Sequence, residues 1–483
     1  MKYSTRLAAA AVLISGLLVL AHCRDATAPT GGDSSQPELS SSSKRLARSG
    51  KWGSTFSWPI VAVHLHVLPN GQVLSWGKVG SPQLWDPASG RFTTRSSPSL
   101  VFCAGATFLA DGRLFVAGGH ASDTHGLANT NIYDFATASW QAVAPMAYAR
   151  WYPTTTTLPD GSVLTLAGTD QNGLVVPTPE LWSSGAWRQL TTATQSLDWY
   201  PRTFVAPDGR VFYAGEDQPS RWLSTAGTGA WSTGPARLVA DRNYGAAVMY
   251  APGKILYVGG GNTPTRGAET IDLNQSAPTW RATGSMSYAR RHLNATVLPT
   301  GDVLVTSGVS GSGFNNLSTA VYAAELWSPA TGTWTTLASA AVPRGYHATA
   351  VLLPDARVLV SGSGDASGAV DQRNAQLFSP PYLFKGTQPA ISSAPTRVSY
   401  GQSFTVSTAQ ASAIANVVLI RLGAATHAFD ESQLYVPLAF TRGSGTLAAV
   451  APANGTIAPP GVYMLFLVDG NGIPSVARMV TVG

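Results

Sequence analysis

The apolar residues of this chain recur as short runs that are separated by tight turns. Each repeating unit contains an apolar run, a turn rich in Pro, Asp and Gly, a second apolar run and then small residues. Turns of this kind between runs of β-branched residues are typical of β-hairpins. Seven such turns occur, at residues 68–71, 109–112, 158–161, 206–209, 250–253, 298–301 and 353–356. The pattern therefore predicts an all-β fold built from a repeated hairpin unit.

The repeat has the length of a propeller blade. The last residues of successive turns lie 41 to 55 residues apart, and units of about 40–50 residues with four strands are typical of β-propellers. Double glycines followed further on by tryptophans, such as Trp182 and Trp187, are kelch-like features. We therefore expect a seven-bladed kelch-like β-propeller over residues 51–387, with residues 52–63 supplying a strand that closes the ring.

The repeat stops near residue 385, and a different pattern of strands follows it. Short apolar runs at 417–421, 462–467 and 477–482 suit a small immunoglobulin-like β-sandwich over residues 388–483. The 483 residues have room for one large domain and a smaller one. Few charged residues (12%) and many glycines (49) and prolines (32) also favour short strands and turns over long solvated helices.

The N-terminus has the pattern of an export signal. Lys2 and Arg6 precede an apolar stretch over residues 7–21, which is short for a mature membrane span. The stretch ends at Cys23 in a sequence like a bacterial lipobox, although His22 stands where a small residue is usual. We expect residues 1–23 to be a signal peptide and residues 24–50 a flexible tether. The protein is then either a cell-envelope lipoprotein, in the periplasm or on the cell surface, held in the membrane by a lipid on Cys23, or a secreted protein cleaved nearby.

The charge pattern excludes nucleic acid as an expected partner. The formal net charge is +6, but the basic residues are scattered and part of them lie in the first 50 positions. No run of Lys and Arg with interleaved aromatic residues occurs, as a nucleic-acid surface would need.

One position of the repeat carries unusual side chains. Nine residues before the last residue of each turn, the seven blades have Ala62, Cys103, Tyr152, Tyr200, Tyr244, His292 and His347. The same offset in a repeated unit means the same place in each blade, here near the start of the innermost strand. We therefore expect these side chains to gather at one end of the central channel, with Cys103 and Tyr152 as neighbours. A structural alternative is that they only fill the channel with polar groups.

Short motifs extend this picture to a known family. They lie at residues 102–103, 149–153, 344–348, 352–355, 426–427, 460–466 and 473–477. In this order, and over residues 52–483, the chain resembles the galactose oxidase and glyoxal oxidase family of mononuclear copper radical oxidases. The resemblance implies a propeller followed by an early-set sandwich domain, and one copper ion per chain.

The resemblance also implies roles for particular residues. Cys103 would be joined through a thioether to the ring of Tyr152, forming a self-derived cofactor that carries a radical. Tyr346 would be the axial copper ligand and base, and Tyr152, His347 and His427 the other ligands. Periodicity alone would not find His427, because it lies outside the repeat in the C-terminal domain.

The implied reaction is the oxidation of small aldehydes or primary alcohols by O2, which yields hydrogen peroxide. The sequence at 150–153 is more like the glyoxal type, so glyoxal-type substrates are favoured over galactose. Asp170 stands about where galactose-type enzymes carry an indole over the cross-linked tyrosine. Trp151 either shields the radical or packs between blades as a rim aromatic.

The remaining predictions concern the pocket, the blade surface and the oligomeric state. Tyr200, Tyr244 and His292 either line the substrate pocket or fill the channel. We expect Tyr288, Arg290 and Arg291 to lie on the blade surface, and we expect a monomer.

Two other functional classes compete with the oxidase. A non-catalytic kelch-type propeller would present its loops to a partner and would purify without copper. A glycoside hydrolase on a propeller is disfavoured, because the chain has no repeated Ser-x-Asp-x-Gly-x-Thr-Trp turns and no convergent set of arginines.

Overall fold

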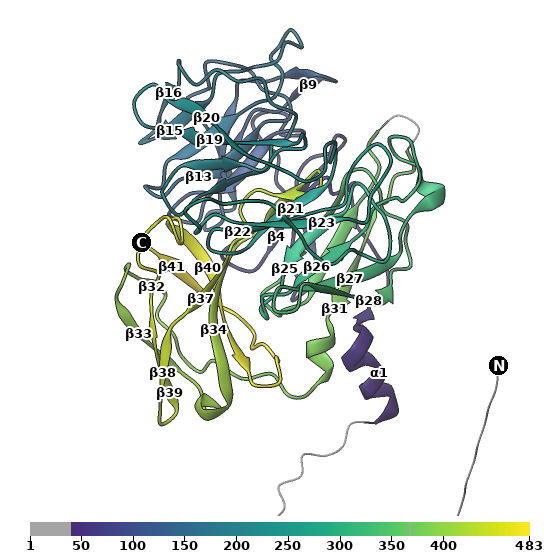
Figure 1. Ribbon diagram of the computed structural model, residues 1–483, viewed down its shortest axis with the longest axis vertical. Helices are drawn as coiled ribbons and strands as arrows, with labels where there is room; N and C mark the ends of the chain where they lie inside the picture. The colour runs from purple at the N-terminus through teal and green to yellow at the C-terminus, as the bar shows by residue number, and fades with distance from the viewer. Residues whose placement is uncertain (1–39, 367–368) are drawn as a thin grey trace, which may run out of the picture. The chain divides into compact units, whose positions relative to one another are not determined.

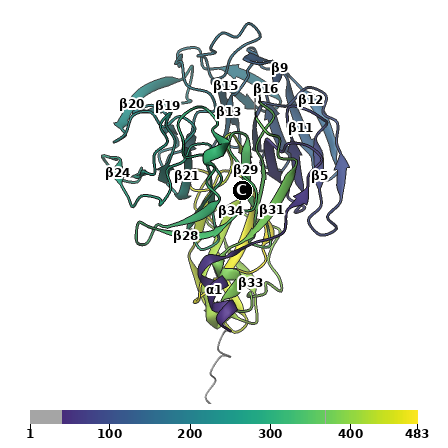
Figure 2. The same ribbon diagram turned by 90° about the vertical axis from the view of Figure 1, so that its right-hand side faces the viewer.

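The computed structural model describes residues 40–366 and 369–483, and the described part of the chain is almost entirely β-structure. Seven successive antiparallel sheets form the blades of a propeller: those of blades 2 to 6 have four strands, and those of the first and last blades have six and five because segments from elsewhere in the chain join them. The first strands of most neighbouring blades contact one another. In Figures 1 and 2 the blades follow one another from purple to green, and the yellow C-terminal strands lie against them. The predicted seven-bladed propeller is confirmed.

The strands of the blades alternate with the turns that the repeat predicts. Blade 1 contains β3 (His64–Val67), β4 (Val73–Trp76), β5 (Gln83–Trp85) and β6 (Phe92–Thr94); blade 2 contains β7 (Gly105–Phe108), β8 (Leu114–Ala117), β11 (Thr130–Asp134) and β12 (Ser139–Val143). Blade 3 contains β13 (Thr154–Thr157), β14 (Val163–Leu166), β15 (Glu180–Ser183) and β16 (Ala186–Gln189); blade 4 contains β17 (Thr203–Val205), β18 (Val211–Tyr213), β19 (Pro219–Ser224) and β20 (Ala230–Ala236). Blade 5 contains β21 (Ala246–Ala251), β22 (Lys254–Val258), β23 (Ala268–Asp272) and β24 (Arg281–Ala282); blade 6 contains β25 (Asn294–Val297), β26 (Val303–Thr306), β27 (Ala323–Ser328) and β28 (Thr333–Ser339). A short hairpin of β9 (His120–Ser122) and β10 (His125–Gly126) is inserted in blade 2.

Blade 7 joins the two ends of the propeller. It contains β29 (Ala348–Leu352), β30 (Val358–Gly362) and β31 (Asn374–Ser379). The N-terminal strands β1 (Lys51–Trp52) and β2 (Phe56–Ser57) pair antiparallel with β31 and complete the sheet. The expected ring closure by the segment that begins at Trp52 is therefore present, because outer-edge backbone groups of the last blade find partners in the first residues of the domain.

The C-terminal domain has two sheets, as expected for a sandwich. One contains β32 (Arg397–Val398), β41 (Arg478–Val482), β40 (Gly461–Asp469), β34 (Ile414–Arg421) and β37 (Tyr435–Leu438); the other contains β33 (Ser403–Ser407), β39 (Thr446–Val450) and β38 (Phe440–Gly443). A hairpin of β35 (Ala424–Thr426) and β36 (Phe429–Asp430) leaves this domain and joins the sheet of blade 1. Short 3₁₀ helices occur at η1 (Leu317–Thr319), η2 (Pro381–Phe384) and η3 (Ala411–Ala413).

One part of the expected tether is helical. Helix α1 (Ser41–Ser49) is capped by the hydroxyl of Ser40 and contacts η2 and β28, and Figure 1 shows it beside β28. Its N-cap and its packing against the propeller explain why a serine-rich segment forms a helix. The signal peptide, Cys23 and the tether up to residue 39 lie outside the described residues. Across the described ranges, no helix has the length and apolar character that crossing a membrane requires.

Arginines inside the blades correct one prediction. Arg290 and Arg291, expected on the surface, are 0% and 1% exposed, whereas Tyr288 is 45% exposed. Arg290 can be buried because Glu325 on the third strand of the same blade forms an ion pair with it at 2.5 Å. The same buried arrangement recurs between Arg150 and Glu180, at 2.9 Å. Arg290 and Arg150 thus belong to a repeated internal ion pair, which apolar periodicity does not reveal, whereas Arg291 is satisfied by the side-chain oxygens of Asn262 and Asn243.

Candidate active site at the mouth of the propeller

The seven positions singled out by the repeat lie immediately before the innermost strands. Six of them share a left-handed backbone, with φ of 62° at Cys103, 63° at Tyr152, 48° at Tyr200, 53° at Tyr244, 58° at His292 and 67° at His347. Non-glycine residues seldom adopt this conformation, and such strain is concentrated at functional sites. The common backbone is a structural signature of the shared register.

Backbone hydrogen bonds link these positions from blade to blade. The amide of Tyr152 donates to the carbonyl of Cys103 at 2.9 Å, and the amide of Tyr200 donates to the carbonyl of Tyr152 at 3.0 Å. His292 donates to Tyr244 in the same way at 3.0 Å. The main chain therefore links the ring positions of blades 2, 3 and 4, and those of blades 5 and 6.

The left-handed turn also changes which way the preceding residue points. In a regular strand, successive side chains lie on opposite faces. Here the rings of Tyr346 and His347 are stacked with their centroids 3.7 Å apart, and those of Trp151 and Tyr152 are stacked at 3.6 Å. The irregular strand start thus places two consecutive side chains on the same side, in blade 3 and again in blade 7.

The β35–β36 hairpin brings His427 to the same place. Strand β35 pairs antiparallel with β3, so that Thr426 lies opposite His64. Glu431, just beyond the hairpin, accepts hydrogen bonds from the amides of Thr155 and Ala106 at 2.6 and 3.2 Å. These bonds fasten the hairpin to blades 3 and 2. The His427 ring consequently lies 4.5 Å from that of Tyr152 and 4.6 Å from that of His347.

Four donor atoms meet at this point. The hydroxyl of Tyr152 forms a short hydrogen bond with the hydroxyl of Tyr346 and lies 3.4 Å from Nε2 of His347. Nε2 of His427 is buried and has no hydrogen-bond partner in the described part of the chain. The arrangement brings together all four residues expected as ligands.

The second nitrogen of each histidine is already occupied. Nδ1 of His347 donates to the carbonyl of Gly364 at 2.6 Å. The hydroxyl of Thr426 donates to the carbonyl of Val63 at 3.0 Å, so it accepts from Nδ1 of His427 at 2.6 Å. Both histidines then carry their proton on Nδ1 and present an Nε2 lone pair, as metal-bound histidines do.

This donor set fits a copper ion. Two phenol oxygens and two imidazole nitrogens are the ligands that tetragonal Cu(II) accepts. Among the described residues no group of three or more His, Cys, Asp and Glu side chains has a spacing that suits a metal. A metal at this site would therefore depend on the tyrosines, and the orphaned Nε2 of His427 is the atom that most needs such a partner.

Burial controls the protonation of these groups. Desolvation lowers the pKa of His347 to about 3, so the ring is neutral at ordinary pH. It raises the pKa of Tyr152 and of Tyr346 well above the usual value for tyrosine, and the neighbouring Cys103 and Tyr244 add to the respective shifts. Without a cation the tyrosines are neutral phenols, and a divalent metal would reverse that preference.

Cys103 lies against Tyr152 in a cluster of buried hydrophobic residues. Its side chain is completely buried, and burial raises the pKa of the thiol well above its usual value, while a side-chain hydrogen bond with Tyr152 acts in the opposite direction. Phe102, Trp151 and Tyr200 complete the cluster around the two residues. A buried thiol held against a phenol has the proximity that a covalent bond between them requires; forming a thioether would remove the thiol hydrogen and one ring hydrogen, with O2 as the two-electron oxidant.

The pocket residues divide into two groups. Tyr200 stacks on His427 with ring centroids 4.5 Å apart and donates to the carbonyl of Ala104, and Tyr244 stands edge-on to Tyr346. His292 is fixed by a hydrogen bond between Nε2 and the carbonyl of Phe314. Asp170, by contrast, accepts from the amides of residues 172 and 174 in a turn, and it does not line the cavity beside Tyr152.

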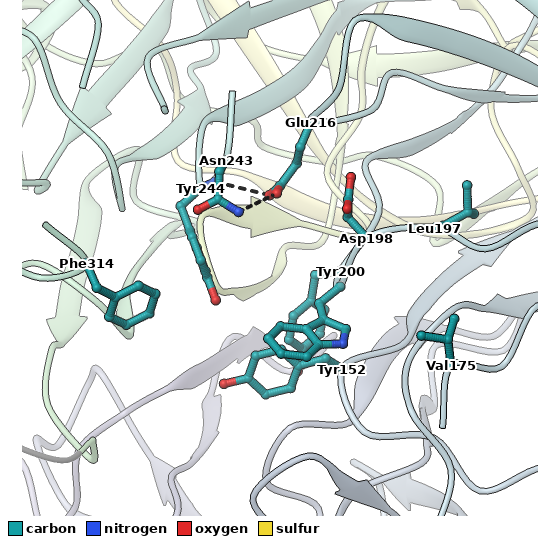
Figure 3. A pocket seen from close by; sticks show the side chains of 10 residues that line it. Tyr152, Val175, Leu197, Asp198, Tyr200, Glu216, Asn243, Tyr244 and Phe314 are labelled. Atoms are coloured by element: carbon teal, nitrogen blue, oxygen red, sulfur yellow. Dashed lines mark hydrogen bonds between the residues drawn. The ribbon is translucent and has the colours of Figure 1, made fainter. Parts of the chain in front are cut away.

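A cavity of about 440 Å³ opens beside Tyr152. Its lining residues are Tyr152, Val175, Leu197, Asp198, Trp199, Tyr200, Glu216, Asn243, Tyr244 and Phe314. Figure 3 shows the hydroxyl groups of Tyr152 and Tyr244 directed toward the same open space, with Asp198 and Glu216 on a further wall. The volume suits a small organic substrate.

Several residues of this site were not singled out from the sequence. Trp199, Asp198, Glu216 and Phe314 line the cavity, and His120 accepts a hydrogen bond from the Trp151 indole at 3.0 Å. Trp199 and Asp198 directly precede Tyr200, so a search of the residues next to the ring positions would have found them. Phe314, in a loop, and His120, at the start of β9, have no repeated offset and give no such signal.

Comparisons with known proteins identify the family. Galactose oxidase from Gibberella zeae is 31% identical over 90% of this chain and 70% of its own length. The chain belongs to the galactose oxidase family. Its C-terminal residues 388–482 match the model of the galactose oxidase-like early set domain, and residues 263–375 match that of the glyoxal oxidase N-terminus. The predicted family and the oxidase class are confirmed.

Relatives of the aldehyde oxidase type are also similar. The aldehyde oxidase GLOX of Vitis pseudoreticulata is 29% identical over 79% of this chain and 81% of its own length. Among solved structures, a fungal alcohol oxidase of the AA5 family in complex with copper superposes with a TM-score of 0.83 and 26% identity, covering 90% of this chain and all of that chain. The structural match supports the two-domain architecture of the described residues.

Proposed function

We propose that this family member is a copper radical oxidase that oxidises small aldehydes or primary alcohols with O2 and releases hydrogen peroxide. The observation that carries the proposal is the convergence of Tyr152, Tyr346, His347 and His427 on one point, with the Cys103 thiol against Tyr152. Relatives that are named galactose oxidase and aldehyde oxidase, and a copper-containing structural neighbour, support it.

The ligand roles follow from the protonation states. Nε2 of His347 and Nε2 of His427 supply two neutral nitrogen ligands. The hydroxyl oxygens of Tyr152 and Tyr346 supply two oxygen ligands. Copper bound here would polarise the substrate oxygen and accept one of the two electrons of the oxidation.

The protein supplies the second electron acceptor and the base. A thioether between Cys103 and the ring carbon next to the Tyr152 hydroxyl makes the phenol easier to oxidise, so that Tyr152 can hold a radical. Tyr346 takes the hydroxyl proton of the substrate, and the Tyr152 radical takes a hydrogen atom from the adjacent carbon. O2 accepts the two electrons and two protons and becomes hydrogen peroxide.

The stacked indole of Trp151 supports its role as a shield for Tyr152. The ring covers one face of the phenol, and its N–H is anchored on His120. Because Trp151 supplies the indole that covers Tyr152, no indole is needed at the position of Asp170. We keep the preference for glyoxal-type substrates over galactose as part of the proposal.

We further propose that the protein is exported and works as a monomer. A lipid on Cys23 would hold it at the cell envelope, and cleavage nearby would release it instead. Labelling of the expressed protein with a fatty acid, in the native chain and in a Cys23→Ala variant, separates these two routes.

The test of the function is copper loading followed by peroxide measurement. The protein is loaded with one equivalent of Cu(II), oxidised, and assayed with glyoxal, glycolaldehyde and galactose. We expect bound copper, peroxide release, and a peptide joining Cys103 to Tyr152 that is lighter than the sum of its parts by two hydrogen atoms.

Cys103→Ala provides the control for the radical. We expect a folded protein that still binds copper and whose peroxide release falls by several orders of magnitude. Unchanged turnover in this variant would exclude the radical assignment. Failure of the native protein to retain copper would instead favour the non-catalytic binding propeller.

A further inference from the structure

The wall of the cavity beyond Tyr152 carries charge of one sign only. Among the ten residues that line it, the two charged side chains, Asp198 and Glu216, are both carboxylates. They stand on the wall opposite Phe314 in Figure 3. The two carboxylates differ in how far the protein already uses them.

Glu216 is committed to the protein. Its carboxylate accepts hydrogen bonds from Asn243 at 2.8 Å and from the amide of Tyr244 at 3.1 Å, and it lies 3.5 Å from the guanidinium of Arg202. The charge of Glu216 is therefore matched within the fold. Its function is to hold the segment that carries Tyr244.

Arg291 is a further cation near the cavity, besides Arg202, and it lies behind aromatic side chains. The guanidinium of Arg291 is buried 5.5 Å from the ring centroid of Tyr244 and 5.4 Å from that of Phe314, and it donates to Asn262 and Asn243. It does not line the cavity, so it offers no hydrogen bond to a ligand there.

Asp198 has unused acceptor capacity. It is half-buried, and one of its oxygens accepts from the hydroxyl of Tyr213 at 3.3 Å. The other oxygen has no hydrogen-bond partner among the described residues. Burial and the neighbouring Asp217 raise the pKa of Asp198 from its usual value. In its ionised form this carboxylate only accepts hydrogen bonds, so it suits a ligand group that donates them.

Trp199 stands next to this carboxylate. It is 40% exposed, and its ring lies edge-on to Trp151 at 4.9 Å and 5.7 Å from the ring of Tyr152. A large aromatic surface beside an acceptor can cover the apolar C–H face of a small molecule while its hydroxyl groups are bound.

We propose that Asp198 and Trp199 form a subsite that selects neutral substrates bearing a hydroxyl group and rejects substrates bearing a carboxylate. This inference rests on the proposed oxidase function and specifies its substrate class. Like charges within a partly desolvated cavity repel strongly, and an anion cannot donate to Asp198. The same repulsion helps to expel the carboxylate that forms when a hydrated aldehyde is oxidised.

The test compares two small aldehydes of similar size. Glycolaldehyde carries a hydroxyl group, and glyoxylate carries a carboxylate. We expect the native enzyme to prefer glycolaldehyde, and Asp198→Asn to raise kcat/KM for glyoxylate relative to glycolaldehyde by at least tenfold, mainly through KM. Added salt should reduce the preference of the native enzyme, because it screens the repulsion.

Asp217→Asn is the matched control. Asp217 is exposed and shares a neighbouring cavity with Asp198, but it does not line the cavity beside Tyr152. The Asp217→Asn variant removes one negative charge, as Asp198→Asn does. We expect it to change the ratio of kcat/KM for glyoxylate to kcat/KM for glycolaldehyde by less than twofold. An unchanged ratio in Asp198→Asn, or an equal change in Asp217→Asn, would overturn the subsite while oxidase activity persists.

Copper content separates this outcome from failure of the function itself. Asp198→Asn should bind copper and form the radical absorption to the same extent as the native protein. If the native protein, fully loaded with copper, oxidises neither of the two aldehydes nor any alcohol, the oxidase proposal fails and the subsite proposal fails with it.

Discussion

The indole of Trp151 lies flat on the phenol ring of Tyr152, with centroids 3.6 Å apart and planes inclined by 11°. Consecutive residues of a strand cannot normally make this contact, because their side chains point to opposite faces. The left-handed φ of 63° at Tyr152 makes it possible. The same device stacks Tyr346 on His347, so the backbone strain at the ring positions has a direct structural product.

The first prediction concerns the lifetime of an oxidised Tyr152. Trp151→Ala removes the cover of the ring and opens it to solvent and reductants, so we expect the radical absorption of the copper-loaded protein to decay roughly tenfold faster. Trp151→Phe should lie between the native protein and the alanine variant.

Trp187→Phe is the control for this measurement. Trp187 lies on β16, the outer strand of the same blade, away from the ring position just before its inner strand. Its indole donates to the carbonyl of Ala144. It should leave the decay unchanged. Equal radical lifetimes in Trp151→Ala and in the native protein would show that the stack does not protect Tyr152.

The second prediction concerns the support of His427. Thr426→Val removes the oxygen that accepts from Nδ1 of His427 at 2.6 Å. Loss of such a partner typically weakens metal binding by about 10–100-fold. We expect this loss of Cu(II) affinity in a competition with a chelator, whereas Thr426→Ser, which keeps the hydroxyl, should bind almost as the native protein does. Equal affinity for all three proteins would argue against His427 as a ligand.

The third prediction concerns the buried ion pairs of the blades. Arg290 and Glu325 are both fully buried at 2.5 Å, so Glu325→Ala leaves a charged guanidinium without its carboxylate. Breaking a buried pair costs about 3–5 kcal/mol. We expect a clear fall in the thermal unfolding midpoint. Asp111→Ala breaks a surface pair with Arg113 and should cost less than about 1 kcal/mol; similar shifts for both variants would contradict the repeated pair as a stabilising element.

The site shows what a repeat can and cannot reveal. Because each blade repeats one register, a fixed offset in the sequence predicts that Cys103, Tyr152 and His347 lie together. His427 belongs to a hairpin from another domain, and its position depends on long-range bonds such as those of Glu431, which have no periodicity. Only family resemblance pointed to it.

Local alternation does not explain the contact between Tyr346 and His347. A regular strand would place Tyr346 and His347 on opposite faces, and the residue with the left-handed backbone is His347 rather than a glycine. The burial of Arg290 and Arg291 was missed for a related reason: charged residues suggest a surface until the internal carboxylate or amide that satisfies each of them is known.

The last prediction concerns acid stability. His66 on β3 is 1% exposed, neither ring nitrogen has a hydrogen-bond partner among the described residues, and the ring is stacked on Trp76 at 4.3 Å. Burial lowers its pKa from 6.5 to about 3. The unfolded chain therefore binds a proton below about pH 6.5 that the native protein does not accept until about pH 3. The free energy of unfolding must fall as the pH decreases through this window, by up to about 1.4 kcal/mol per pH unit from this residue alone.

In His66→Phe, which keeps the aromatic stack, we expect the copper-free protein to lose less stability between pH 6.5 and 4 in urea unfolding. A part of the slope remains, since burial also lowers the pKa of His64, His292, His347 and His427. His125→Phe, in the β9–β10 hairpin, should follow the native curve, and a His66→Phe curve parallel to the native one would mean that His66 takes up its proton in the folded state.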